Sequence, residues 1–204
     1  MAKKRQKFYK TPVIAGKYKG RNVHIPSTNT TRSSKAVLRE SLFNTIGFDI
    51  IDKGFVEVFA GSGSVAIEAV SRGASRAWCM ERDKNSYQML KENIDRITSG
   101  EIEAIWGDSF EMFGSVIDEV HRQKLEAFFY FDPPFSIREG MDDIYQKVFD
   151  LIKKIDGSLA MMVIIEHMSG LELPEEIGDF ELQKSRKFGK SSLSYYLPKD
   201  RAND

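Results

Sequence analysis

The sequence has a single cysteine, no long apolar run and no acidic residue before position 40. One cysteine, Cys79, cannot form an internal disulfide, and this usage is typical of a reducing compartment. No stretch of about 18 apolar residues occurs, so the sequence predicts no membrane-spanning helix. The basic N-terminus is not followed by the apolar segment of a secretory signal. We therefore expect a cytoplasmic protein.

The composition is that of an ordinary globular domain. Its 204 residues are 41% hydrophobic and 29% charged, enough for one domain with an appendage. Three histidines, His24, His121 and His167, are scattered along the chain. With one cysteine they provide no zinc-ligand spacing, so we expect no metal site. No extended apolar surface pattern calls for a partner subunit, and we expect a monomer.

The zero net charge conceals an asymmetry between the two parts of the chain. Residues 1–39 contain eleven lysines and arginines and no acid, so the remainder carries an equal excess of acids. A basic segment of this kind is typical of proteins that bind a polyanion, although a solvated tail would have the same composition. Candidate nucleic-acid contacts are Lys17, Lys19, Arg21, Arg32 and Arg39.

The apolar patterning predicts an α/β fold. Residues 11–25 resemble a hairpin with a basic turn at 16–20, residues 26–34 a polar linker, and residues 35–48 a helix with Ser33 or Ser34 as its N-cap. Strands are then predicted at 54–59, 76–80, 102–106, 127–131 and 159–165, alternating with helices at 65–71, 85–97, 112–121 and 141–155. This alternation indicates a mostly parallel sheet, to which 180–185 and 193–197 add an antiparallel hairpin. We divide the chain into a basic N-terminal extension, 1–34, and a catalytic domain, 35–204.

A cofactor pocket is predicted where successive strands end. Gly61 and Gly63 allow a sharp turn between the first strand and its helix, and Glu81 closes the next strand. A carboxylate there can accept both hydroxyls of an adenosine ribose, while Asp108, after the third strand, can accept an adenine amino group. Each of these acids could instead cap a helix or a turn. The candidate cofactor residues are Glu57, Phe59, Ala60, Gly61, Ser62, Gly63, Glu81, Arg82, Asp108 and Ser109.

The motif Asp132-Pro133-Pro134-Phe135 follows the apolar strand 127–131 directly. Two prolines end the strand and stiffen the loop, which as a structural feature alone would be a rigid turn. At the edge that carries the cofactor acids, the Asp132 carboxylate and the Pro133 carbonyl can orient an exocyclic base amine toward a methyl donor, and Phe135 can stack on the base. These four residues are the predicted catalytic set for an S-adenosylmethionine-dependent methyltransferase.

Other functions share parts of this pattern. A DNA adenine-N6 or cytosine-N4 methyltransferase uses the same catalytic logic, but it normally needs a sizeable recognition domain, for which this chain has little room. A non-catalytic RNA-binding ribosome-assembly factor would explain the basic segment but not the Asp-Pro-Pro-Phe motif. An NAD-dependent oxidoreductase would place a pyrophosphate at the glycine turn, where Glu57 is unfavourable.

Residues 11–197 resemble the bacterial 16S rRNA (guanine(966)-N(2))-methyltransferase family. The matching segments are 14–21, 31–32, 39–44, 59–64, 67–69, 71–74 and 132–135. The sequence departs from the family pattern at Ser33, Ala36 and Val37, where the family usually has a proline, an acid and a basic residue. The resemblance implies a Rossmann-like class I fold with a seven-stranded sheet, S-adenosylmethionine as cofactor, and 16S rRNA in the small ribosomal subunit or an assembly intermediate as partner.

Overall fold

The computed structural model describes residues 8–26, 32–134 and 143–201. The N-terminal hairpin pairs β1 (Phe8–Pro12) with β2 (Asn22–Pro26) in antiparallel register, with Thr11 opposite Val23. The predicted hairpin exists, but its first strand ends at Pro12, before the apolar pair Val13 and Ile14 that a turn at 16–20 would place in that strand. Val13 is instead 2% exposed in the loop between the strands, because the loop folds onto the body of the protein and buries its apolar residues there.

Helix α1 (Arg32–Ile46) begins earlier than the sequence predicted and continues into a short 3-10 helix, η1 (Gly47–Ile50). Ser33 and Ser34 therefore lie inside the helix, and the prediction that one of them is its N-cap was wrong. The apolar side chains that gave the helical periodicity, Leu38, Leu42 and Phe43, are at most 2% exposed. They hold α1 against the sheet.

The central sheet has the strand order β5-β4-β3-β6-β7-β10-β9-β8. Its strands are β3 (Gly54–Glu57), β4 (Arg76–Glu81), β5 (Ile102–Trp106), β6 (Ala127–Phe131), β7 (Ala160–Met168), β8 (Glu176–Ile177), β9 (Phe180–Phe188) and β10 (Ser191–Pro198). The strands from β5 to β7 are parallel, whereas β10 runs antiparallel between β7 and β9. The predicted mostly parallel sheet with a terminal antiparallel hairpin is confirmed, but it has eight strands where the family resemblance implied seven, because the two-residue β8 pairs with the outer side of β9.

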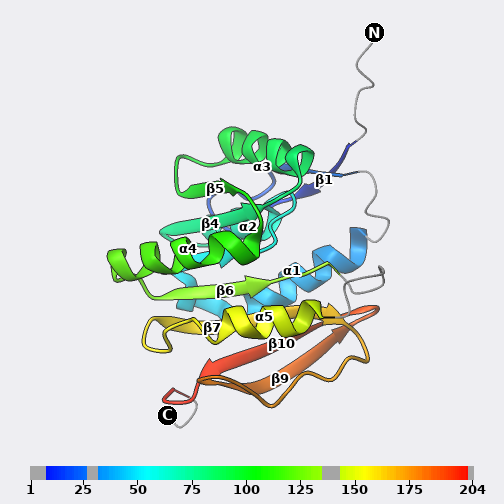
Figure 1. Cartoon of the computed structure of the whole chain (residues 1–204). Helices are drawn as coiled ribbons and strands as arrows, with labels where there is room; N and C mark the ends of the chain where they lie inside the picture. The colour runs from blue at the N-terminus through cyan, green and yellow to red at the C-terminus, as the bar shows by residue number, and fades with distance from the viewer. Residues whose placement is uncertain (1–7, 27–31, 135–142, 202–204) are drawn as a thin grey trace.

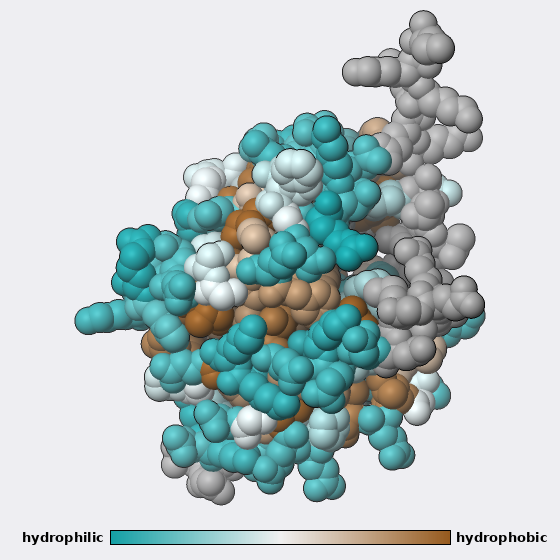
Figure 2. Space-filling view, viewed as in Figure 1, coloured by the Kyte–Doolittle hydropathy of each residue, from teal (hydrophilic) through white to brown (hydrophobic). Residues whose placement is uncertain are grey.

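Helices cover both faces of this sheet (Figure 1). Helices α1, α2 (Ser64–Ser71) and α3 (Lys84–Ile97) pack on one face, and α4 (Ser109–Gln123) and α5 (Ile144–Ile152) on the other. Both faces of the sheet are apolar, as strand β6 illustrates. Its residues Phe128 and Tyr130 pack in the core beneath α1, α2 and α3, whereas Phe129 and Phe131 pack in the core beneath α4 and α5. On the α4–α5 side the surface is mostly hydrophilic, with apolar side chains gathered between the helices (Figure 2).

The parallel strands all end at one edge, which Figure 1 shows at the right beside the N-terminal hairpin. In open α/β sheets this carboxyl edge is where ligands bind. Cys79 is fully buried in β4. Within the described ranges, no helix is long and apolar enough to cross a membrane, and no cluster of histidine, cysteine and acidic side chains could hold a metal ion.

Candidate active site

The glycine turn between β3 and α2 is held by contacts with the neighbouring strand. Gly61 and Gly63 have φ angles of 53° and 74°, which favour glycine. A Cβ on Gly63 would lie 2.3 Å from Leu90 Cδ1, so a larger residue there would also collide with α3. The Gly61 amide donates to Glu81 Oε2 over 2.8 Å, and the Ala60 amide donates to the Met80 carbonyl. The turn therefore presents a fixed backbone surface at the carboxyl edge.

The first cavity at this edge, the β4–β5 cavity, has a volume of about 310 Å³. Phe59 and Phe110 form an aromatic wall, with ring centroids 5.5 Å apart. Glu81 lines the cavity while its Oε1 accepts from the Asp83 amide, and burial raises the pKa of this carboxyl. The lining comprises Phe59, Gly61, Met80, Glu81, Arg82, Asp83, Asp108, Ser109, Phe110, Asp132, Pro134 and Ile144.

The sequence left two roles open for Asp108, a helix cap or a residue of the cofactor pocket, and the structure allows both. Its Oδ1 accepts from the Phe110 amide over 2.9 Å, so it caps α4, and its side chain also lines the β4–β5 cavity. Arg82 is exposed and lies 3.4 Å from Asp108 Oδ2. Ser109 is buried, and its hydroxyl donates to the carbonyl of Val58. All four predicted residues at the ends of β4 and β5 thus line one cavity.

A second cavity, the α1 cavity, lies between α1, the N-terminal hairpin and the glycine turn, with a volume of about 400 Å³. Its lining includes Ala60, Gly61 and Ser62 of the turn, Thr11 and Pro12 of the hairpin, and Lys35 of α1. Glu57 also lines it, is 3% exposed and accepts from the Ala66 amide over 2.9 Å. Burial raises the pKa of Glu57 to about 8.

Asp132 stands where the two cavities meet, because both are lined by Phe59, Gly61 and Asp132. It follows β6 directly, and its side chain is 28% exposed. Pro133 is buried and Pro134 exposed, while Phe135 lies outside the described residues. The carboxylate that the sequence singled out therefore lies within reach of ligands in either cavity.

Asp132 belongs to a network of charged side chains that sequence reasoning missed. Lys35 donates to Asp132 Oδ2 over 2.8 Å and to Glu166 Oε1 over 2.7 Å. Glu166, on β7, is fully buried, and its Oε2 accepts from the Tyr130 hydroxyl over 2.6 Å. One ammonium group thus joins two carboxylates in the lining of the α1 cavity.

The network sets the protonation of its members. Burial and the nearby Glu166 carboxylate raise the pKa of Asp132 to about 6, while Lys35 opposes that rise. Burial alone would lower the pKa of Lys35, but the two carboxylates outweigh it and hold that pKa above its usual value. Lys35 is therefore a cation, and Asp132 is mostly ionised at neutral pH.

The predicted basic residues do not all lie free on the surface. Lys17 bonds to Glu101 over 2.5 Å, and Arg21 donates to the Ile97 carbonyl over 2.8 Å. Lys19 is exposed, and Arg32 is the first residue of α1, with its side chain outside what the structure describes. Arg39 is 5% exposed and donates to Pro12 O and Thr11 Oγ1, so its contacts dock the hairpin.

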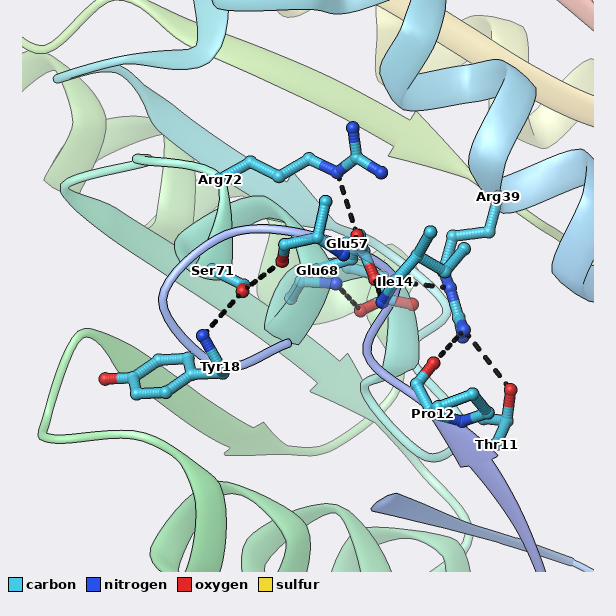
Figure 3. Close-up of polar contacts among 11 residues, drawn as sticks. Thr11, Pro12, Ile14, Tyr18, Arg39, Glu57, Glu68, Ser71 and Arg72 are labelled. Atoms are coloured by element: carbon cyan, nitrogen blue, oxygen red, sulfur yellow. Dashed lines mark hydrogen bonds and ion pairs between the residues drawn. The ribbon is translucent and has the colours of Figure 1, made fainter. Parts of the chain in front are cut away.

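Glu68 anchors the N-terminal segment to α2 (Figure 3). This fully buried carboxylate accepts from the amides of Ile14 and Ala15 over 2.8 and 3.0 Å. Arg72 donates to it over 2.8 Å, and Arg39 lies 3.7 Å away. The segment that forms one wall of the α1 cavity is therefore anchored to α2, the helix that follows the glycine turn.

Lys35, Glu166 and Phe110 are the site residues that the sequence did not single out. Lys35 was counted in the basic segment, but nothing in the linear order relates it to Asp132, which is 97 residues away. Glu166 closes the apolar run of β7, so an acid at the end of a buried strand was its available signal. Phe110 follows Asp108 by two residues, and the apolar face of α4 would have accounted for it equally well.

Comparison with known proteins identifies relatives of this chain in sequence and in fold. Ribosomal RNA small subunit methyltransferase D of Buchnera aphidicola (Baizongia pistaciae) is 28% identical over 96% of this chain and 95% of its own. The Escherichia coli K12 protein of that name is 26% identical over 90% and 88%. The solved structure of yhhF from Escherichia coli matches with a TM-score of 0.71 at 21% identity, covering 93% of this chain and 98% of that one.

A more distant structure has the same fold. SMU.776, solved as a complex with SAH, matches with a TM-score of 0.64 at 10% identity, covering 96% of this chain and 57% of that one. The model of the family described as Conserved hypothetical protein 95 matches residues 11–197, which include β2, the glycine turn, Asp132 and Glu166. The chain belongs to this family.

Proposed function

We propose that this chain is an S-adenosylmethionine-dependent methyltransferase acting on the exocyclic N2 amino group of a guanine in 16S rRNA. The observation that carries the proposal is the position of Asp132 on a proline-stiffened loop where the two cavities meet. A methyl donor and a base amine can approach each other at such a junction. The proposal treats residues 1–34 as an RNA-contacting extension and residues 35–204 as the catalytic domain.

The residues of the β4–β5 cavity fit the adenosine part of S-adenosylmethionine. Glu81 offers carboxylate oxygens to the ribose hydroxyls, Asp108 to the adenine amino group, and Phe59 and Phe110 an apolar wall for the ring. The ionised Asp132 near the glycine turn suits the cationic groups of this cofactor better than a pyrophosphate, and Glu57 would join it because a bound cation lowers the pKa of a nearby carboxyl. When bound, S-adenosylmethionine supplies an electrophilic methyl group.

The chain's own residues prepare the base amine. An ionised Asp132 accepts a hydrogen bond from the amino group and can take the proton that the nitrogen releases. The Pro133 carbonyl is a second acceptor, and the prolines keep the loop from reorganising in the transition state. Phe135 completes the catalytic set by stacking on the extruded base, a contact worth about 1–3 kcal/mol.

The relatives support RNA as the substrate. The Buchnera and Escherichia coli proteins are named ribosomal RNA small subunit methyltransferases, and they match nearly the full length of this chain. The SAH in the SMU.776 complex is the demethylated form of the proposed cofactor. The basic residues before Glu40 suit an RNA partner by charge. We propose the small ribosomal subunit, or an intermediate in its assembly, as the particle that presents this RNA.

Replacing Asp132 by asparagine tests the chemical role. The amide would keep the size of the side chain but lose the charge and one acceptor. We expect methyl transfer to fall by about 10²–10³-fold, the usual cost of removing a preorganised polar group. The affinity for S-adenosylmethionine, measured by calorimetry, should change little. The matched control is Asp118→Asn on the exposed face of α4, which should keep full activity. Turnover close to wild type in Asp132→Asn would refute the assigned role.

A further inference from the structure

The turn between β9 and β10 carries a second concentration of positive charge. Between residues 184 and 190 there are four basic side chains and no acid, although residues 40–204 as a whole have an acidic excess. The four residues are Lys184, Arg186, Lys187 and Lys190, and all are exposed. We call residues 184–191 the β9–β10 tip.

The β9–β10 tip lies at the same edge of the sheet as Asp132. Strand β10 pairs with β7 so that Leu193 is opposite Glu166 and Ser191 opposite Met168. Beyond these pairs the Ser169 amide donates to the Lys190 carbonyl over 2.9 Å. Since a strand rises about 3.3 Å per residue, Lys190 lies about 10 Å along the strand from the Glu166–Lys35–Asp132 network. A nucleotide strand entering the site would pass within reach of it.

The β9–β10 hairpin directs the basic side chains of the tip to both faces of the sheet. Arg186 is opposite Leu193 and points to the α1 face of the sheet, whereas Lys187 is opposite Ser192 and points to the other face. The turn itself has Gly189 at φ 64° followed by Lys190, as in a two-residue hairpin turn that holds its strands in register. Lysine and arginine side chains on such a support can follow a phosphate backbone.

These cations form no ion pair with an acid of the described chain. Among the ion pairs of the described residues, none involves Lys184, Arg186, Lys187 or Lys190. The ammonium of Lys184 lies 5.1 Å from the ring centroid of Tyr195, which positions it without neutralising it. By contrast, Lys17 of the N-terminal segment already pairs with Glu101.

The basic residues of the β9–β10 tip could instead protect an exposed edge of the sheet, and this alternative predicts a different effect on RNA binding. On its outer side β9 pairs with β8 at Phe180 and Glu181, so residues 184–188 form an outer edge of the sheet. Lysines on an edge strand discourage pairing with other chains. Such charges would protect solubility whether or not RNA is bound, and their removal would leave RNA affinity unchanged.

We infer that the β9–β10 tip is an RNA-binding surface that holds backbone phosphates beside the target nucleotide. This inference rests on the proposed function, because it takes RNA as the substrate. In Figure 1 the N-terminal hairpin lies near α3 on one side of the carboxyl edge, and the turn between β9 and β10 lies on the other. The tip thus supplies a basic contact on the side of Asp132 opposite the hairpin, where it can hold the strand while one base is drawn out into the site.

The test is the salt dependence of RNA binding by the full-length triple variant Arg186→Gln, Lys187→Gln, Lys190→Gln. The probe is a fluorescein-labelled RNA stem–loop with an unpaired guanine, and the readout is anisotropy over a series of KCl concentrations. Losing three phosphate contacts should flatten the slope of log K against log[salt] by about 2, and weaken binding about 10- to 100-fold near 0.1 M salt.

The control variant removes the same charge from the opposite edge. Lys124 and Lys153 follow the ends of α4 and α5, and Lys154 is the next residue. The triple variant Lys124→Gln, Lys153→Gln, Lys154→Gln should bind the stem–loop as the wild type does. A tip that keeps its charge through Arg186→Lys, Lys187→Arg and Lys190→Arg should also retain wild-type binding. Melting curves of all variants identify any loss of folding.

The outcomes separate this inference from the proposed function. If the glutamine variant of the tip binds with the wild-type slope, or if both glutamine variants weaken binding equally, the tip is not an RNA-binding surface. The inference also falls if the wild type does not bind the stem–loop. Methyl transfer by the wild type is measured separately. If transfer is absent while the tip variant alone loses RNA affinity, the surface stands and the methyltransferase proposal fails.

Discussion

At the scale of single residues, the charge of Asp132 depends on two neighbours that act in opposite directions. Burial and Glu166 favour the protonated acid, whereas Lys35 favours the carboxylate. Because the proposed chemistry needs the carboxylate, activity should fall as the pH drops through the pKa of Asp132. Lys35 on α1 and Glu166 on β7 therefore determine together the pH range in which the Asp132 carboxylate is ionised.

Replacing Lys35 by methionine should move the acidic limb of the kcat/KM profile to higher pH. The variant removes the cation that lowers the pKa of Asp132, so that pKa rises. We expect a shift of about 1–2 pH units, the usual effect of one opposite charge at hydrogen-bonding distance. The measurement is methyl transfer between pH 5 and 9, with Lys35→Arg as the variant that keeps the charge.

Removing the Glu166 carboxylate should shift the pH profile in the opposite direction to the removal of Lys35. Glu166→Gln removes the negative charge that raises the pKa of Asp132, so the acidic limb should move to lower pH. The amide can still accept from the Tyr130 hydroxyl, which preserves the packing around it. If both variants lowered activity equally at every pH, Lys35 and Glu166 would be structural and would not tune Asp132.

Glu57 predicts a pH dependence of stability in the cofactor-free protein. Its pKa is about 8 in the folded chain, against an ordinary value of 4.5. The folded state therefore retains a proton that the unfolded state loses, and this contribution to stability is complete below pH 4.5 and lost as the pH rises through 8. The wild type should lose up to about 1.4 kcal/mol per pH unit relative to Glu57→Gln across this window. Urea unfolding at several pH values measures this, and parallel curves for the two proteins would contradict it.

At the scale of elements, the N-terminal segment is held to α2 by Glu68, whose loss should loosen that segment. Glu68→Gln leaves the buried Arg39 without its carboxylate and should cost about 3–5 kcal/mol of unfolding free energy. Hydrogen exchange should speed up first at the amides of Ile14 and Ala15, which donate to this carboxylate.

The matched control for this element is Glu92→Ala on the exposed side of α3. It should leave both stability and the exchange of these amides unchanged. If Glu68→Gln unfolded the whole protein without faster exchange at Ile14 and Ala15, the carboxylate would support the core in general and would not be a specific anchor.

Elements with a clear apolar pattern were predictable from the sequence. Segments whose conformation depends on contacts with distant parts of the chain were not. Strands β5 and β6 have the predicted bounds, and for β6 the reason is that an uninterrupted apolar run between polar residues defines a buried strand by itself. The apolar pair Val13–Ile14 was assigned to a strand, yet it lies in a loop because the side chain of Glu68, more than 50 residues away, binds the loop's backbone. The two-residue strand β8 and the longer β9–β10 hairpin likewise depend on pairing across the sheet.

At the scale of the whole molecule, the carboxyl edge gathers Glu81, Asp108, Asp132 and the β9–β10 tip. The sequence predicted that the acids after successive strands share one edge, because parallel strands end together. It could not predict the Lys35–Glu166 contact or the position of the β9–β10 tip, since both depend on how distant elements pack. The eleven basic residues before Glu40 drew attention to one end of the chain, while the tip adds charge from the other.

The most direct test of the central claim is methyl transfer from radiolabelled S-adenosylmethionine to unmethylated small ribosomal subunits. Naked 16S RNA and duplex DNA are assayed in parallel, and the labelled nucleoside is identified after digestion. The account predicts N2-methylguanosine from the ribosomal RNA, with no label when Asp132→Asn replaces the wild type. Label in DNA adenine or cytosine would contradict the proposed substrate, and no label in any nucleic acid despite S-adenosylmethionine binding would contradict the proposed activity.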